Sequence, residues 1–366
     1  MNARERILAV LDRQPVDRLP VDLWHTPEVA AALRAHVGTQ DDLDLYEALG
    51  LDKIVWVFPE YRMEDGALVG SLTTGQETPK RTVWGTLLRT VRSGAAHYEE
   101  FADRPLSGYE TPASLDRYPY WPDPARFDYA AAVAKARRAA RTFAVIGPWV
   151  SLFEIYCQLR GLEQAMIDLT ENPPFVDAVL DRIEAIQAEM MRQYFDQAAG
   201  LLDLVFVSDD IAGQQNLLIS PRMWRRHLQP RMVRWCALIH SYGLKVFYHT
   251  DGAAGALIGP LIDCGIDVLN PIQHVCPGME RERLKKQFGA RVIFHGGVDN
   301  QSVLPFGTPA DVRAETRRCL ETLGAGGEGY ICCSCHNVQA GTPVENIFAM
   351  IETVRDACVD ARPGGA

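Results

Sequence analysis

The chain has 366 residues, of which 47% are hydrophobic and 23% are charged, as in an ordinary soluble protein with a sizeable core. Its formal charge is -10 and it has no basic block, so nucleic acid is not an expected partner. No run of about 18 apolar residues occurs, and residues 1–7 lack the apolar core of a signal peptide. We therefore expect no membrane span, and we expect a cytoplasmic protein with reduced cysteines.

Strand and helix patterns alternate along most of the chain. Residues 70–98 interrupt this alternation, because short β-branched and aromatic runs there flank a glycine turn, which predicts an inserted β-hairpin near residues 70–100. About eight β/α units favour a closed barrel over an open sheet, so we expect a single (β/α)8 TIM-type barrel of the α/β class, forming one domain over residues 1–362. The predicted strands, in chain order, are residues 18–24, 52–58, 143–147, 203–210, 244–252, 267–270, 291–297 and 329–333.

Two of the predicted strands end in residue types that bind metals. His249 and Asp251 end one strand and share a side of it, while His336 follows the last strand. The carboxyl ends of barrel strands meet at one face, where these side chains would form a facial set for Zn(II), or for Fe(II) or Mn(II). Cys335 is the best alternative ligand. The competing interpretation is that these residues only form hydrogen bonds at the barrel mouth.

Carboxylates mark two further positions near the predicted mouth. Asp209 and Asp210 end the strand of residues 203–210, where they can orient a histidine, hold a substrate cation or share a proton. Capping of a helix or turn is the competing role. Glu154 lies at the start of a helix predicted over residues 152–169 and can act as an acid or a fourth metal ligand, although glutamates in a first helical turn are common for dipole reasons alone.

Other residues at strand ends are candidates for contact with a substrate. They are His25, Trp149, Gln273 and His295, and the glycines after His295 indicate a close backbone approach. A lone histidine at such a place is more often structural than catalytic. The chain has no phosphate-binding Walker loop, no dinucleotide fingerprint after a strand and no Gly-x-Ser-x-Gly motif, which argues against nucleotide-dependent and serine-hydrolase chemistry.

Taken together, the motifs of the chain resemble those of the uroporphyrinogen decarboxylase superfamily, which includes the decarboxylase and cobalamin-linked methyltransferases. The resemblance covers nearly the whole chain and implies the barrel fold; members are often dimers, so it also implies a homodimer. The motifs that carry it are RQPVDRLP (13–20), GPW (147–149), LRG (159–161), YHTDG (248–252), GGVD (296–299), HNVQ (336–339) and TPVEN (342–346).

The resemblance does not fix one reaction. The decarboxylase holds its substrate carboxylates with an Arg-Gln-Ala-Gly-Arg motif after the first strand, whereas residues 23–28 here read LWHTPE. A tetra-acidic porphyrinogen needs several cations, because each buried carboxylate is costly unless it is paired, so this difference argues against that substrate.

The zinc methyltransferases of the superfamily carry His-x-Cys after one strand and a further Cys before Thr-Pro-x-Glu-Asn. This chain has His249-Thr-Asp251 at the first place and, by spacing, His336 at the second. We therefore expect a metal-dependent methyltransferase or demethylase that moves a methyl group between a small substrate and a corrinoid, carried by a separate small protein. Histidine and aspartate are harder ligands than thiolates, and they would favour activation of a methyl ether, amine or carboxylate as the substrate rather than of a soft thiol. The alternatives are a cofactor-free decarboxylase and a sensor or assembly protein without chemistry.

Overall fold

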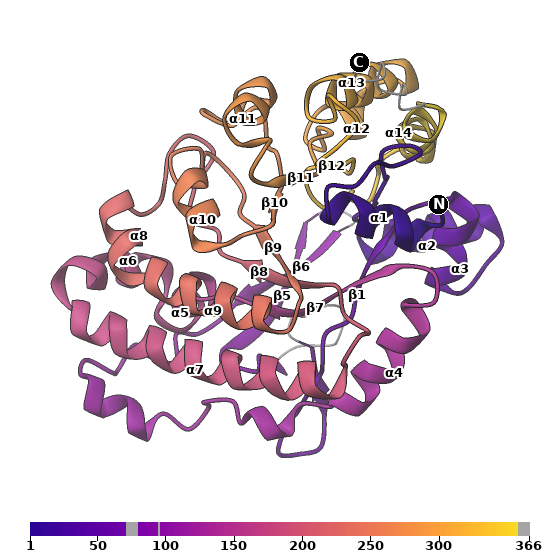
Figure 1. Ribbon diagram of the computed structural model, residues 1–366. Helices are drawn as coiled ribbons and strands as arrows, with labels where there is room; N and C mark the ends of the chain where they lie inside the picture. The colour runs from indigo at the N-terminus through magenta and orange to yellow at the C-terminus, as the bar shows by residue number, and fades with distance from the viewer. Residues whose placement is uncertain (71–79, 94–95, 358–366) are drawn as a thin grey trace.

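The computed structural model describes residues 1–70, 80–93 and 96–357, and its centre is a barrel of parallel strands surrounded by helices (Figure 1). Parallel neighbours need crossover connections, and the helices between successive strands supply them. This arrangement confirms the predicted α/β barrel. Within the described part of the chain, the main sheet runs in the order β1 (Ile54–Trp56), β7 (Ala144–Val150), β8 (Leu204–Ser208), β9 (Lys245–His249), β10 (Val268–Asn270), β11 (Ile293–His295) and β12 (Tyr330–Ile331).

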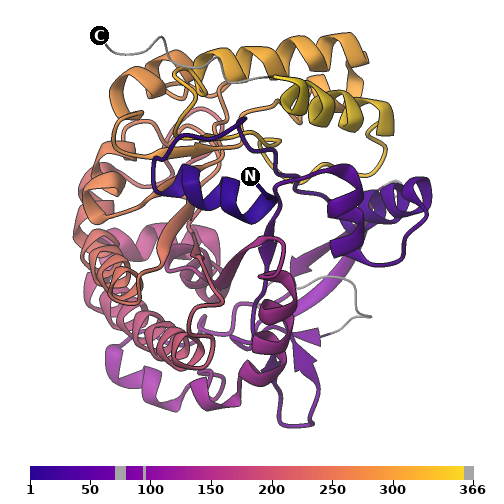
Figure 2. The ribbon, with the colours of Figure 1, turned by 45° about the vertical axis from the view of Figure 1, so that its right-hand side comes forward.

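The first predicted strand closes the barrel between its two edges. The N–H of Asp22 donates to the carbonyl of Cys332 beyond β12 at 2.8 Å, and the N–H of Asp52 before β1 donates to the carbonyl of Val21 at 2.7 Å. An isolated bridge between Val21 and Cys332 on one side and a hydrogen bond from Asp52 on the other, rather than a continuous ladder, hold this segment in place. The indigo N-terminal and yellow C-terminal parts of the chain consequently lie side by side (Figure 2).

Helices cover the outside of the barrel (Figure 1) and contribute apolar side chains to its core. One predicted helix, over residues 152–169, is two helices in the structure, because Gly161 adopts a φ of +84° that ends the first of them. The helices are α1 (Ala3–Leu11), α2 (Pro27–Val37), α3 (Asp42–Leu49), α4 (Tyr129–Ala139), α5 (Phe153–Arg160), α6 (Leu162–Glu171), α7 (Pro173–Gln197), α8 (Pro221–His227), α9 (Gln229–Ser241), α10 (Ile258–Cys264), α11 (Arg281–Phe288), α12 (Val303–Phe306), α13 (Pro309–Thr322) and α14 (Val344–Asp356).

The chain between β1 and β7 forms small antiparallel sheets outside the barrel. Strand β2 (Tyr61–Arg62) pairs with β3 (Leu68–Val69), and β5 (Leu87–Ser93) pairs with both β4 (Lys80–Arg81) and β6 (Ala96–Phe101). Residues 71–79 and 94–95 of the predicted hairpin lie outside the described residues. Two short 3-10 helices, η1 (Pro112–Arg117) and η2 (Pro124–Arg126), precede α4.

Most residues of the barrel strands are buried. Every residue of β7 and β8 is buried, which is typical of parallel strands covered by helices. No helix among the described residues is both long enough and apolar enough to cross a bilayer.

Candidate active site at the carboxyl ends of the strands

Three potential metal ligands meet at the mouth of the barrel. His249 is the last residue of β9, Asp251 follows it by two positions, and His336 follows β12. One ligand atom from each lies within 4.8 Å of the others, and Nε2 of His336 is 4.0 Å from Oδ2 of Asp251. His249 is only 6% exposed, whereas the side chains of His336 and Asp251 are 40% and 34% exposed, so the group opens toward solvent.

The chemistry of this donor set fits a zinc ion. Two imidazoles and one carboxylate are ordinary zinc ligands, and tetrahedral coordination would place their ligand atoms about 3.3 Å apart, which small side-chain movements can reach. Burial and the neighbouring His249 lower the pKa of His336, against the opposing effect of Asp251. His336 is therefore held toward the neutral form, which is the form that binds a metal.

Cys335, the predicted alternative ligand, is not brought to this group. Its thiol donates to the carbonyl of Ile272 at 3.3 Å, and its side chain is 4% exposed. Burial raises the pKa of this thiol well above its ordinary value, which holds Cys335 in the neutral form.

Glu154 and Asp210 form an acidic pair beside the three ligands. Glu154 Oε1 accepts hydrogen bonds from Oγ of Ser208 at 2.5 Å and from the N–H of Asp210 at 3.2 Å. Asp210 Oδ1 accepts from the N–H of Asp251 at 2.9 Å, which connects the pair to the ligand group. Burial, followed by the charges of Asp210 and Asp209, raises the pKa of Glu154 to about 8. Glu154 is therefore largely protonated at neutral pH and can act as a general acid.

Asp209 lies beneath the N-terminus of α5. Its Oδ1 accepts hydrogen bonds from Oγ of Ser151 at 2.8 Å and from the N–H groups of residues 152, 153 and 154. Burial raises the pKa of Asp209 to about 7 even though these donors favour the ionised form. The carboxyl group caps α5 from a neighbouring strand and so fixes the backbone that carries Glu154.

A cavity of about 550 Å³ opens next to the acidic pair. Glu154 and Asp210 both line it, and Trp149 of β7 contributes to its wall. The remaining wall is mostly apolar and aromatic and includes Trp84, Phe101, Phe127, Phe153, Leu162, Met190 and Leu218. A pocket of this kind binds molecules with an apolar body and uses its few polar groups to orient them.

The other predicted substrate contacts lie in different places. Nε2 of His25 is 3.0 Å from the hydroxyl of Tyr46, and burial, followed by the charge of Lys53, lowers the pKa of His25. Gln273 accepts from the N–H of Gly252 at 2.8 Å and supports the turn after Asp251. His295 lies inside the barrel with no exposed surface.

Sequence comparison identifies the family. The uroporphyrinogen decarboxylase (URO-D) profile matches residues 107–357. The chain belongs to this family. The chain is 27% identical over 149 residues to the methylcobamide:CoM methyltransferase MtaA of Methanosarcina barkeri, which covers 41% of the chain and 40% of that relative. It is also 29% identical over 175 residues to the uroporphyrinogen decarboxylase of Thermus thermophilus, which covers 48% of the chain and 47% of the relative.

A solved structure supports the same URO-D fold. A methyltransferase from Methanosarcina mazei matches 97% of this chain and 99% of its own with a TM-score of 0.68 at 19% identity, a similarity that shows the fold alone. The curated relatives are enzymes of two kinds, methyltransferases and decarboxylases, and each match spans less than half of the relative.

Three polar residues of this URO-D protein escaped the sequence prediction. Asp22, Lys53 and Asn270 are each at most 5% exposed. Asn270 contacts His249 at the mouth directly, and Lys53 and Asp22 connect to Asn270 through His295. Asp22 and Lys53 were detectable as charged residues within or beside apolar strand runs, where burial without a partner would be costly. Asn270 ends a predicted strand next to Pro271, but its sequence context carries no signal that names its partners.

Proposed function

We propose that this protein is a metal-dependent methyltransferase or demethylase that moves a methyl group between a small substrate and a corrinoid carried by a separate protein. The meeting of His249, Asp251 and His336 beside the cavity of Glu154 and Asp210 carries the proposal. A relative named as a methylcobamide:CoM methyltransferase supports the reaction class.

His249, Asp251 and His336 would hold the metal, with Zn(II) as the expected ion. When bound, such an ion supplies Lewis-acid polarisation of the substrate atom that carries the methyl group. Imidazole and carboxylate ligands are harder than thiolates, so a hard oxygen or nitrogen atom suits this site better than a soft thiol. A methyl ether, methylated amine or methyl carboxylate is the substrate class that follows.

Glu154 would supply the proton in the demethylation direction. The bond between the methyl carbon and the heteroatom would break, the heteroatom would keep the electron pair, and the methyl group would leave as a cation equivalent, for which a reduced corrinoid on the separate protein would supply the nucleophile. The heteroatom then takes the proton of Glu154, whose raised pKa of about 8 keeps that proton available at neutral pH. Asp210 would orient the polar end of the substrate.

The test is elemental analysis of untagged protein, with wild type beside His249→Ala and His336→Ala. His36→Ala is the matched control, because His36 is exposed on α2 and belongs to neither candidate ligand group. We expect about one zinc per chain in wild type and control and a loss in both site variants. A wild type that binds no metal after zinc addition, or full demethylase activity in His249→Ala, would overturn the proposal.

A cofactor-free decarboxylase is the second candidate, and the match to a uroporphyrinogen decarboxylase favours it. In that reaction His336 and Asp210 would exchange the protons. The missing arginine pair at residues 23–28 and a cavity lined by two acidic side chains and one arginine, Arg104, speak against a polycarboxylated substrate, which would need several cations. Incubation with porphyrinogens, followed by mass spectrometry for loss of carbon dioxide, distinguishes the two reactions.

A further inference from the structure

A buried series of hydrogen bonds leads from the barrel interior to His249. Nζ of Lys53 donates to Oδ1 of Asp22 at 2.9 Å, and Oδ2 of Asp22 is 3.0 Å from Nε2 of His295. Nδ1 of His295 is 2.7 Å from Nδ2 of Asn270, and Oδ1 of Asn270 is 2.6 Å from Nδ1 of His249. All five residues are at most 6% exposed, so the series is shielded from bulk water.

Strand register explains why these groups meet. His249 pairs with Asn270 across β9 and β10, and the pairing of Leu269 with Phe294 continues this row to His295 at the end of β11. Neighbours in register on parallel strands point to the same face of the sheet. The last residues of the three strands therefore stand side by side in the barrel interior.

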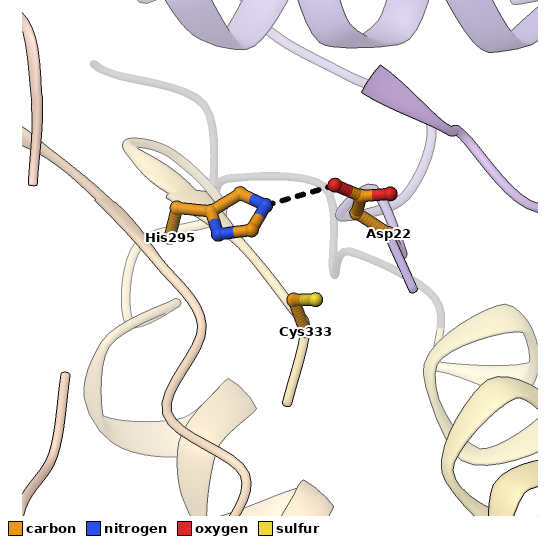
Figure 3. A group of neighbouring side chains, drawn as sticks. All are labelled: Asp22, His295 and Cys333. Atoms are coloured by element: carbon orange, nitrogen blue, oxygen red, sulfur yellow. Dashed lines mark hydrogen bonds and ion pairs between the residues drawn. The ribbon is translucent and has the colours of Figure 1, made fainter. Parts of the chain in front are cut away.

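Part of this series resembles a metal site, because Asp22, His295 and Cys333 also have ligand atoms within 4.8 Å of one another (Figure 3). The carboxylate of Asp22 is already satisfied by Lys53, by His295 and by the N–H of Leu23 at 2.7 Å. A cation bound there would lie close to the Lys53 ammonium. The group is therefore better explained as part of a hydrogen-bonded network than as a metal site.

The direction of each hydrogen bond follows from the one before it. Lys53 can only donate, and the ionised Asp22 can only accept, so Nε2 of His295 carries a proton and donates. Burial opposes ionisation of Asp22, but the Lys53 ammonium and His295 hold the pKa of this carboxyl below its ordinary range. Burial also lowers the pKa of His295, which is thus neutral and has an unprotonated Nδ1 that accepts from Asn270.

The orientation of the Asn270 amide also follows from a contact that does not depend on the protonation of the His295 ring. Its Nδ2 also lies 3.4 Å from the backbone carbonyl of His295, an atom that can only accept. The NH2 group therefore faces His295, and Oδ1 faces His249. An amide oxygen can only accept, so Nδ1 of His249 must be the donor of the hydrogen bond that joins them.

We propose that Asn270 and His295 are positioning residues that set the tautomer of His249, placing its proton on Nδ1 and leaving Nε2 as a lone-pair donor. The effect of the tautomer on metal binding rests on the proposed function, whereas the assignment of the tautomer does not depend on that function. Outer groups of this kind orient a metal-binding histidine, and losing one typically weakens metal affinity about 10- to 100-fold.

The tautomer can be read directly by long-range ¹H–¹⁵N correlation NMR on histidine-labelled, metal-free protein, with the His249 signals assigned by their loss in His249→Ala. We expect Nδ1–H in the wild type. Asn270→Leu should lose this preference and bind zinc about 10- to 100-fold more weakly in a chelator competition. Asn346→Leu is the matched control, because it removes a buried amide that donates to the carbonyls of Leu304 and Gly307 and belongs to neither the buried series nor the ligand group, and it should leave both readouts unchanged.

Asn270→Asp gives a second test if the leucine variant does not fold. The substituted carboxylate still accepts from His249 but cannot donate to His295, so His249 should keep its tautomer while His295 gains a proton on Nδ1. A wild type with His249 protonated on Nε2, or an Asn270→Leu variant with the wild-type tautomer, would overturn the inference. An Nδ1–H tautomer in a wild type that binds no zinc would sustain it while removing the metal-dependent function.

Discussion

Replacement of Glu154 by glutamine should change how stability depends on pH. The pKa of Glu154 rises from an ordinary 4.5 to about 8 in the folded protein. At about 1.4 kcal/mol for each pH decade between these values, ionising the buried group costs about 5 kcal/mol. Because Glu154 borders the cavity, water screens part of this cost. We therefore expect ionisation of Glu154 to destabilise the folded protein by about 2 to 3 kcal/mol.

The sign follows from the raised pKa. The contribution of Glu154 to the free energy of unfolding is fully present below pH 4.5 and is lost as the pH rises through about 8. Over this range the carboxyl group ionises freely only in the unfolded chain. Glutamine keeps the oxygen that accepts from Ser208 and from the N–H of Asp210 but cannot ionise. At pH 5 the two proteins should thus differ little, and at pH 9 Glu154→Gln should be the more stable by about 2 to 3 kcal/mol.

The assay is urea unfolding followed by tryptophan fluorescence from pH 5 to pH 9. Glu163→Gln makes the same chemical change on the exposed side of α6 and serves as the control. Stability curves for wild type and Glu154→Gln that run parallel over this range would refute the raised pKa and, with it, the role of Glu154 as proton donor.

Three further predictions concern single sites. Asp209→Ala removes the acceptor beneath α5 and should lower the free energy of unfolding by about 3 kcal/mol, whereas Asp209→Asn keeps Oδ1 and should cost about 1 kcal/mol in the same urea assay. Cys335→Ser should keep the wild-type metal content in elemental analysis, since this thiol lies apart from the ligand group; a lost equivalent would make the sulfur a ligand. Gly147→Ala places a Cβ 2.0 Å from the carbonyl oxygen of Val57 and should cost about 3 kcal/mol in thermal unfolding, while Gly108→Ala, with open space around it, should not.

The barrel was predictable because each parallel strand is a short apolar run bounded by helical patterns. The segment of residues 18–24 shows the limit of this reasoning: its apolar run predicts a strand, but it holds its place through isolated hydrogen bonds on both sides rather than a ladder. The division at Gly161 was also missed, because a helical pattern on both sides of a glycine does not reveal its positive φ.

The mouth group was predictable for a topological reason. Residues at the carboxyl ends of barrel strands converge, so His249, Asp251 and His336 could be expected near one another. The buried hydrogen-bonded series from Lys53 to His249 could not be predicted in this way, because it depends on the register of the strands. Whether His295 faces a substrate or the barrel interior is decided by the pairing of β10 with β11, which sequence spacing does not contain.

The buried hydrogen-bonded series and the acidic pair lie on either side of the ligand group, and two groups with opposite shifts in pKa meet there. Lys53 balances Asp22 inside the barrel, while the shifts in pKa hold His336 toward its neutral base and Glu154 toward its neutral acid. Opposite shifts in neighbouring groups assign an acid and a base within one site. A cation entering beside Asp251 would therefore meet unprotonated nitrogen donors already oriented to receive it, and in the proposed demethylation Glu154 would supply the proton from the cavity side.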